Sequence, residues 1–169
     1  MKDHQKAAGM VILLAMLVAA ADQGCKWLLV RHLMVGESSV LVPRVLELTY
    51  RQNRYAAFSA LPSLSPTMLL AISLLVLVIF TVLIWPYLCR RTIFAAAVLV
   101  YGGAFGNLID RVRLHYVVDY LDFRVWPVFN FADICVVVGV GLLMLGILRA
   151  DRALTASSVA DSETGRLSI

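Results

Sequence analysis

GGAFGNLIDRVRLHYVVDYLDFRVWPVFNFAD, residues 102–133, decides the fold, because it begins inside one long apolar segment and ends at the start of another. It concentrates the polar side chains of a chain with few charges: Asn107, Asp110, Arg111, Asp119, Asp122, Asn130 and Asp133. Ionisable groups in or beside a membrane span are costly to insert and usually serve a function. The stretch therefore predicts a polar site at the boundary of a membrane.

The composition is that of a membrane protein. Of the 169 residues, 61% are hydrophobic and 15% are charged, whereas soluble domains average about 45–50% and about 25%. A net charge of +4 suits contact with anionic lipid headgroups, and no basic stripe indicates a nucleic-acid partner. Cys25, Cys89 and Cys135 lack CxxC spacing and the histidines form no zinc pattern, so we predict no metal site and no disulfide framework.

Four apolar segments approach the roughly 20 residues that span a bilayer. The first, residues 7–21, resumes its apolar character at 27–30, and the residues before Cys25 are too polar for a lipoprotein cleavage site, so we interpret it as a retained helix. The others are 67–88, 92–107 and 132–148. Gly102, Gly103 and Gly106 indicate close helix packing. We predict a single four-helix transmembrane domain over residues 1–150 and a polar, disordered tail over 151–169.

The segment between the first two spans, residues 31–66, is polar by the standard of this chain and contains turn residues. Residues 45–51 alternate apolar and polar side chains, which indicates a half-exposed strand, and residues 40–42 could pair with it. Residues 53–59 suit a loop that dips back towards lipid. The predicted fold class is therefore an all-α membrane protein with four transmembrane helices, a small extracytoplasmic sheet and a short interfacial segment.

An even number of spans places both termini on one side of the membrane. Lysine and arginine counts on the two sides are equal, but their density is highest in the short Arg90-Arg91 turn, which favours the cytoplasm for the termini and this turn. Asp22 and Lys26 lie four residues apart on the first span, hence on one face, and we expect them to pair. Alternatively, Lys26 reaches water from the helix end.

Asp119 and Asp133 are the candidates for a catalytic pair, because both are embedded in apolar sequence. Two carboxylates in one desolvated site cannot both ionise readily, so one can take a proton from water while the other polarises a carbonyl. The structural alternatives are a loop acid for Asp119 and a helix cap for Asp133. Helical spacing allows Asn107 or Asp110 to orient Arg111. No GxSxG, Ser-x-x-Lys or Cys–His arrangement offers a rival nucleophile.

Five motifs occur in order: DQGCK at 22–26, NRYAAFS at 53–59, GNLIDR at 106–111, VVD at 117–119 and FNFAD at 129–133. On these motifs the chain resembles the bacterial lipoprotein signal peptidases (signal peptidase II), over nearly its whole length apart from the tail. The resemblance implies a multi-pass inner-membrane aspartic endopeptidase with no cofactor, which cuts prolipoproteins just before their diacylglyceryl-modified cysteine. It also implies a β-cradle, cytoplasmic termini and an active site near the periplasmic face.

The resemblance assigns roles to individual residues. Asp119 and Asp133 fall on the catalytic pair, and Asp122 does not. The positions that hold substrate or support the pair are Asn53, Asn107, Arg111 and Asn130. Structural polar positions are Asp22, Lys26 and Asp110, the last as a partner for Arg111. The implied partners are diacylglyceryl-prolipoprotein signal peptides and membrane lipids, with no nucleic acid, and we expect a monomer.

Two residues depart from the family pattern. Cys25 stands where serine or threonine is usual, a small change, and Tyr55 stands where glycine is usual. A bulky side chain is unfavourable if that loop needs a positive φ. Two other classes stay open from sequence: a small ion or proton carrier that uses interfacial acids, and a catalytically inactive homologue of the peptidases.

Overall fold

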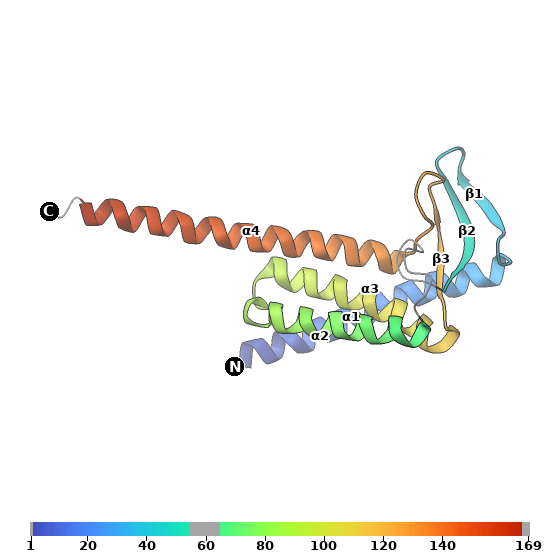
Figure 1. Cartoon of the computed structure of the whole chain (residues 1–169), viewed down its shortest axis with the longest axis horizontal. Coiled ribbons are helices and arrows are strands. Elements are labelled where there is room, and N and C mark those ends of the chain that lie inside the picture. The colour runs from blue at the N-terminus through green and yellow to red at the C-terminus, as the bar shows by residue number, and fades with distance from the viewer. Residues whose placement is uncertain (1, 55–64, 167–169) are drawn as a thin grey trace.

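The computed structural model describes residues 2–54 and 65–166, and of Pro66 and residues 150–166 it describes the backbone. In chain order the elements are α1 (Lys2–His32), β1 (Ser38–Val42), β2 (Leu46–Asn53), α2 (Pro66–Ile84), the 3-10 helix η2 (Trp85–Tyr87), α3 (Arg91–Leu114), β3 (Val117–Asp122) and α4 (Phe131–Arg166). Figure 1 shows the helices running side by side, with the sheet at one end of the bundle and the start of α1 at the other.

The helices are those of a membrane protein. Four of them are long and apolar enough to cross a bilayer, over Lys2–His32, Thr67–Tyr87, Arg91–Leu114 and Phe131–Arg149. Their outward faces remain apolar, since Leu83 is 67% and Val137 70% exposed. Exposed apolar area on this scale suits lipid as the surrounding solvent. The prediction of four transmembrane helices is confirmed.

α3 is the centre of the bundle and packs against α1, α2 and α4. Its glycines permit the close approach: a Cβ atom on Gly103 would collide with Ala132 O of α4, and one on Gly106 would lie 2.5 Å from Asp22 Oδ2 of α1. Small residues serve this purpose widely in membrane bundles. The predicted close packing is confirmed, and it also brings the polar part of α1 against α3.

The sheet is antiparallel with strand order β1-β2-β3. The predicted pairing of residues 40–42 with 45–51 is confirmed by the registers Val40↔Glu47 and Val42↔Leu46. The third strand, β3, is not among the sequence predictions. Its first four residues are all buried, so the strand lacks the alternating pattern that indicates a half-exposed strand.

β3 carries Asp119 into the sheet. In the pairing of β2 with β3, Arg51 lies opposite Asp119 and Asn53 opposite Val117. Side chains two residues apart on a strand share a face, so Asn53 and Asp119 are diagonal neighbours on one face of the sheet. The end of β2 is thereby placed beside the predicted catalytic acid.

α3 and α4 both extend beyond their predicted spans. α3 continues past Asn107 to Leu114 and ends at His115, whose φ of 62° is left-handed and whose N–H bonds to Arg111 O. α4 continues to Arg166, as Figure 1 shows, which differs from the disordered tail expected from residue 151. Low hydrophobicity removes the drive to pack, but extension of an existing helix avoids the cost of nucleation, and no proline interrupts residues 150–166.

Candidate active site

Asp119 and Asp133, called the aspartate pair below, meet at the sheet end of the bundle. Asp119 comes from β3, and Asp133 comes from the first turn of α4. Asn130, directly before α4, contacts both of them: its Nδ2 donates to Asp119 Oδ1 at 2.7 Å and its backbone N–H to Asp133 Oδ2 at 3.2 Å. The structure therefore brings the two acids that the sequence singled out into one site.

Asp133 also caps its helix. Its backbone N–H donates to Asn130 Oδ1 at 3.0 Å, while its carboxylate accepts from the Asn130 backbone. This reciprocal arrangement is a capping box, which satisfies two backbone N–H groups at the start of a helix. The cap and the acid-pair interpretations of Asp133 are thus compatible, because the cap fixes the carboxylate where it meets the site.

Two more amide side chains supply the remaining hydrogen bonds to the aspartate pair. Asn53 Nδ2 donates to Asp119 Oδ2 at 2.8 Å, and Asn107 Nδ2 donates to Asp133 Oδ1 at 2.8 Å. Every carboxylate oxygen of the pair therefore accepts a hydrogen bond from a neutral N–H group. Three of the four predicted supporting residues, Asn53, Asn107 and Asn130, touch the pair directly.

The two acids differ in burial. Asp119 is 3% exposed, and Asp133 is half-buried. Burial first, and the charge of Asp133 second, raise the pKa of Asp119 to about 7, although hydrogen bonds from Asn53 and Asn130 act in the opposite direction. At neutral pH the pair can therefore hold one proton, with Asp119 as its carrier. Such a pair can act as acid and base on one reactant.

Arg111 supplies the positive charge nearest the pair on α3. The half-buried guanidinium interacts electrostatically with Asp133 most strongly, then with Asp119, and then with Asp110. Its Nη1 donates to Asn107 O at 3.4 Å. The predicted partnership of Asp110 with Arg111 stays a prediction: the two interact electrostatically, while the hydrogen bonds of Asp110 are to Gln23 of α1 and Val118 of β3.

Beneath the pair lies a second polar group, the anchoring cluster of Asp22, Gln23, Lys26 and Asp110. Lys26 Nζ lies 2.7 Å from Asp22 Oδ2 and 2.9 Å from Asp110 Oδ2, so the predicted pairing of Asp22 with Lys26 is confirmed. Each acid of the cluster also accepts from the backbone next to one member of the pair: Asp110 from Val118 N–H at 3.1 Å and Asp22 from Ala132 N–H at 3.0 Å.

Gln23 is the member of this cluster that the sequence analysis missed. Its Nε2 donates to Asp110 Oδ1 at 2.8 Å and to Gly106 O at 3.1 Å, joining α1 to α3. The available signal was its place beside Asp22 and three residues before Lys26, within a polar interval of an otherwise apolar span.

Other sequence candidates lie away from the pair. Asp122 accepts from Thr49 Oγ1 at 3.2 Å and from Arg124 N–H at 2.7 Å, at the far end of β3. Cys25 is exposed on α1. Tyr55, with the rest of the motif that follows Arg54, lies outside the described residues. Among residues 2–54 and 65–166, no group of three or more His, Cys, Asp or Glu side chains is arranged to hold a metal ion.

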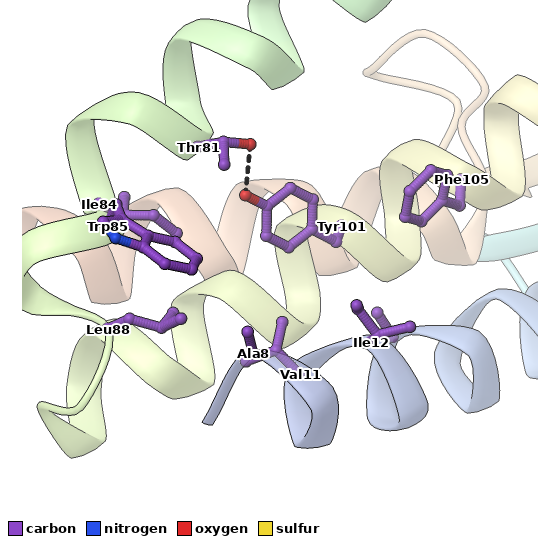
Figure 2. A pocket seen from close by; sticks show the side chains of 10 residues that line it. Ala8, Val11, Ile12, Thr81, Ile84, Trp85, Leu88, Tyr101 and Phe105 are labelled. Atoms are coloured by element: carbon purple, nitrogen blue, oxygen red, sulfur yellow. Dashed lines mark hydrogen bonds between the residues drawn. The ribbon is translucent and has the colours of Figure 1, made fainter. Parts of the chain in front are cut away.

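A cavity of about 240 Å³ lies elsewhere, between α1, α2, η2 and α3. Figure 2 shows apolar side chains around it and one hydrogen bond, between the hydroxyls of Thr81 and Tyr101 at 2.7 Å. No carboxylate, amide or amine side chain lines it. The aspartate pair and its supporting amides therefore contribute no side chain to this cavity.

Comparisons with known proteins agree with the sequence motifs. A family model described as "Signal peptidase (SPase) II" matches residues 14–149. The lipoprotein signal peptidase of Halothermothrix orenii is 44% identical over 145 residues, which cover 85% of this chain and 98% of that protein. The lipoprotein signal peptidase of Desulfitobacterium hafniense is 42% identical over 141 residues, covering 80% and 91%.

Solved structures show the same architecture. A bacterial membrane enzyme determined by the in meso method at 2.3 Å resolution is similar with a TM-score of 0.75 and 30% identity, covering 83% of this chain and 88% of that one. A second, at 1.9 Å resolution, is similar with a TM-score of 0.72 and 30% identity, covering 83% and 93%.

Proposed function

The chain belongs to the signal peptidase II family of lipoprotein signal peptidases, which are aspartic peptidases, and from that premise we propose that Asp119 and Asp133 are its catalytic residues. The observation that carries the proposal is the shared contact with Asn130, which holds a buried and a half-buried carboxylate in one site. A family of aspartic peptidases requires two such acids on one water molecule and one carbonyl.

The chemistry follows from the different burial of the two acids. Asp133 takes a proton from water as the water oxygen bonds to the scissile carbonyl carbon, and Asp119 gives its proton to the carbonyl oxygen. The resulting tetrahedral diol then collapses: one hydroxyl returns its proton to Asp119, the C–N bond breaks, and the leaving nitrogen takes the proton held by Asp133. Atoms and charges balance, and no other reactant is consumed.

The neighbouring polar residues take supporting roles. Asn53, Asn107 and Asn130 orient the carboxylates by neutral hydrogen bonds, whose lowering effect on the pKa of Asp119 is smaller than the raising effect of burial and of Asp133. Arg111, with its positive charge close to both acids, is suited to bind a polar group of the substrate beside the scissile bond. A fixed guanidinium also favours the charge that develops on the carbonyl oxygen.

The substrate is the signal peptide of a prolipoprotein, processed in the bacterial inner membrane by this multi-pass protein. We place the cut just before a cysteine that carries a diacylglyceryl group. Exposed apolar side chains in the loop between β3 and α4 support a lipid-bearing substrate: Val125 is 92% and Trp126 58% exposed. The termini then lie in the cytoplasm and the site near the periplasmic face, with a monomer as the active form.

Cleavage of defined substrates tests this function. The purified protein in lipid vesicles is incubated with a prolipoprotein that carries the diacylglyceryl group and with the same protein lacking it. We expect cleavage of the lipidated form alone, with mass spectrometry locating the cut immediately N-terminal to the modified cysteine. Equal cleavage of both forms, or a cut elsewhere, would contradict the proposed specificity.

The alternative of an ion or proton carrier has no support in the comparisons. Its acids would line a path through the bilayer, whereas the described acids of the site gather at the sheet end of the bundle (Figure 1). The same cleavage assay tests the second alternative, an inactive homologue.

A further inference from the structure

Lys26 is buried beneath the aspartate pair and uses all of its hydrogen-bonding capacity there. Its side chain is 3% exposed, and an ammonium group has three N–H donors and no acceptor. The three donors go to Asp22 Oδ2 at 2.7 Å, Asp110 Oδ2 at 2.9 Å and Asn107 Oδ1 at 2.9 Å. The third contact is the important one, because Asn107 in turn touches Asp133.

The contact with Lys26 determines which way the Asn107 amide faces. Its Oδ1 must point to the ammonium, since only an oxygen can accept from a group that can only donate. Asn130 Nδ2 donates to the same oxygen at 3.1 Å. The amide nitrogen is therefore left to face Asp133 Oδ1, at 2.8 Å.

Asn130 is fixed in the same manner. Its Oδ1 accepts from the backbone N–H of Asp133 at 3.0 Å, so its Nδ2 supplies the bond to Asp119 Oδ1 at 2.7 Å. Both amides thus present N–H groups to the acids, and neither amide can turn without losing a bond from a group that can only donate. A hydrogen bond from an N–H group favours the ionised form of the carboxylate that accepts it; at Asp119 burial and the charge of Asp133 outweigh this effect.

From this network we propose that Lys26 is a positioning residue for catalysis: through Asn107 it keeps Asp133 as the proton acceptor of the pair. The proposal rests on the proposed function, in which Asp133 is the base. Without the ammonium, the Asn107 oxygen keeps only the weaker, neutral donor Asn130 Nδ2 at 3.1 Å, so the amide turns its oxygen towards Asp133 more readily. That orientation favours a proton on Asp133, and the site then lacks its base.

Other charged groups face Asp133, and the test must separate Lys26 from them. Arg111 on α3 and Asp119 on β3 interact electrostatically with Asp133, while Asp22 on α1 and Asp110 on α3 contact Lys26 itself. Among them, Lys26 is the one that donates to the Asn107 side chain. The distinguishing property of Lys26 is therefore its effect on Asn107.

The primary test is the pH dependence of cleavage by Lys26→Met, a neutral side chain of similar length. We expect kcat at neutral pH to fall about 10- to 100-fold, as for other residues that orient an active-site group, and KM to stay within about twofold because Lys26 does not meet the substrate. The acidic limb of the kcat profile should move to higher pH. A normal kcat with an unmoved limb would overturn the proposal.

Gln23→Leu is the matched control. Gln23 lies in the same cluster and bonds to Asp110 and Gly106, but its bonds do not include the Asn107 side chain. We expect a lower melting temperature with the acidic limb where it is in the parent protein. If Gln23→Leu moves the limb as far as Lys26→Met does, the effect belongs to the cluster as a whole and the proposal fails.

Lys26→Met leaves the buried carboxylates of Asp22 and Asp110 without their cation, which opposes folding. A second variant with balanced charge is therefore needed. Lys26→Met/Asp110→Asn removes one charge of each sign and keeps an amide oxygen to accept from Val118 N–H. The shifted limb should persist in this double variant. Adding Lys26→Met to Asn107→Leu should cause no further loss of kcat, since Lys26 acts through Asn107; an additive loss would contradict that route.

The two proposals fail in different ways. If Asp133→Asn retains turnover, the assignment of the aspartate pair is wrong whatever Lys26 does. If Asp133→Asn is inactive but Lys26→Met keeps both its turnover and its pH profile, the pair stands and the role of Lys26 is withdrawn.

Discussion

Two pairs of aspartates lie within one hydrogen-bonded network, and the protein surrounds them differently. In the anchoring cluster, the ammonium of Lys26 lies between Asp22 and Asp110, 2.7 and 2.9 Å from their nearest oxygens. In the aspartate pair, the direct donors to Asp119 and Asp133 are neutral amides. This difference between a charged and a neutral donor distinguishes the structural acids Asp22 and Asp110 from the proposed catalytic acids.

A cation between two carboxylates stabilises their ionised forms, and ionised carboxylates are strong acceptors for backbone N–H groups. The anchoring cluster therefore ties α1 to the backbone at Val118 and Ala132. Neutral donors orient carboxylates without supplying a compensating charge, so two acids in close proximity retain a shared proton. One arrangement serves the fold and the other serves proton transfer.

The largest expected effect is the loss of turnover in Asp119→Asn and in Asp133→Asn. Asparagine keeps the shape and an acceptor oxygen but can neither hold nor accept the catalytic proton. We expect kcat to fall by about 10⁴-fold, as when an essential carboxylate of a catalytic set is replaced, with little change in melting temperature. Steady-state cleavage of a lipidated prolipoprotein measures the loss.

Asp122→Asn is the control for both variants. Asp122 lies on the same strand as Asp119, but its bonds are to Thr49 and the backbone of Arg124. We expect normal turnover from this variant. An inactive Asp122→Asn, or an active Asp119→Asn, would contradict the division of acids drawn above.

The second effect is a dependence of stability on pH that belongs to Asp119. Burial and the charge of Asp133 raise the pKa of Asp119 to about 7 in the folded protein, whereas an unfolded aspartate titrates near pH 4. Between these values the folded chain holds a proton that the unfolded chain has released. This contribution to stability is therefore complete below about pH 4 and is lost as the pH rises to about 7.

Over that window the loss is on the order of 4 kcal/mol, at about 1.4 kcal/mol per pH unit. Unfolding in mixed micelles from pH 4 to pH 8 should show it in the parent protein. Asp119→Asn should lose this part of the pH dependence and keep the part due to other groups. Identical pH dependence in the two proteins would mean that Asp119 titrates in its ordinary range.

The third effect tests the anchoring cluster through Asp110→Ala. This change removes the acceptor of Val118 N–H and one of the carboxylates that hold Lys26. We expect the free energy of unfolding to fall by about 3 kcal/mol, the scale of a broken buried charge network. Asp122→Ala, at a half-buried position, should cost less than about 1 kcal/mol. Equal losses in thermal unfolding would remove the distinction between the two acids.

The sequence predicted the fold where one physical pattern dominates. Four apolar runs of membrane length predicted four helices, and alternation over residues 45–51 predicted the hairpin of β1 and β2. β3 was missed because both of its faces are buried at Val117–Tyr120, so no alternation remains. The tail beyond residue 150 was expected to be disordered from its polarity, whereas α4 continues to Arg166, because extending an existing helix adds backbone hydrogen bonds without a new nucleation cost.

The site could be predicted as a set of residues but not as a set of contacts. Asp22 and Lys26 paired as their spacing indicated, because both lie on one helix. Asp110 was assigned to its sequence neighbour Arg111, with which it interacts electrostatically, but its ion pair and hydrogen bonds with α1 and β3 were not predicted. Contacts between elements depend on how closely the helices approach, which here depends on Gly106 admitting Asp22.

The smallest expected effect is at the cavity lined by Thr81 and Tyr101, away from both pairs of aspartates. Thr81 Oγ1 donates to Leu77 O at 2.7 Å, so its oxygen accepts from the Tyr101 hydroxyl, also at 2.7 Å. Thr81→Val preserves shape and removes that acceptor, which should cost about 0.6 kcal/mol, the average for side-chain hydrogen bonds between membrane helices. Turnover should remain normal, because this bond joins α2 to α3 without reaching the sheet end. A loss of kcat comparable to that of the aspartate variants would contradict this expectation. It would mean that the cavity is coupled to the active site.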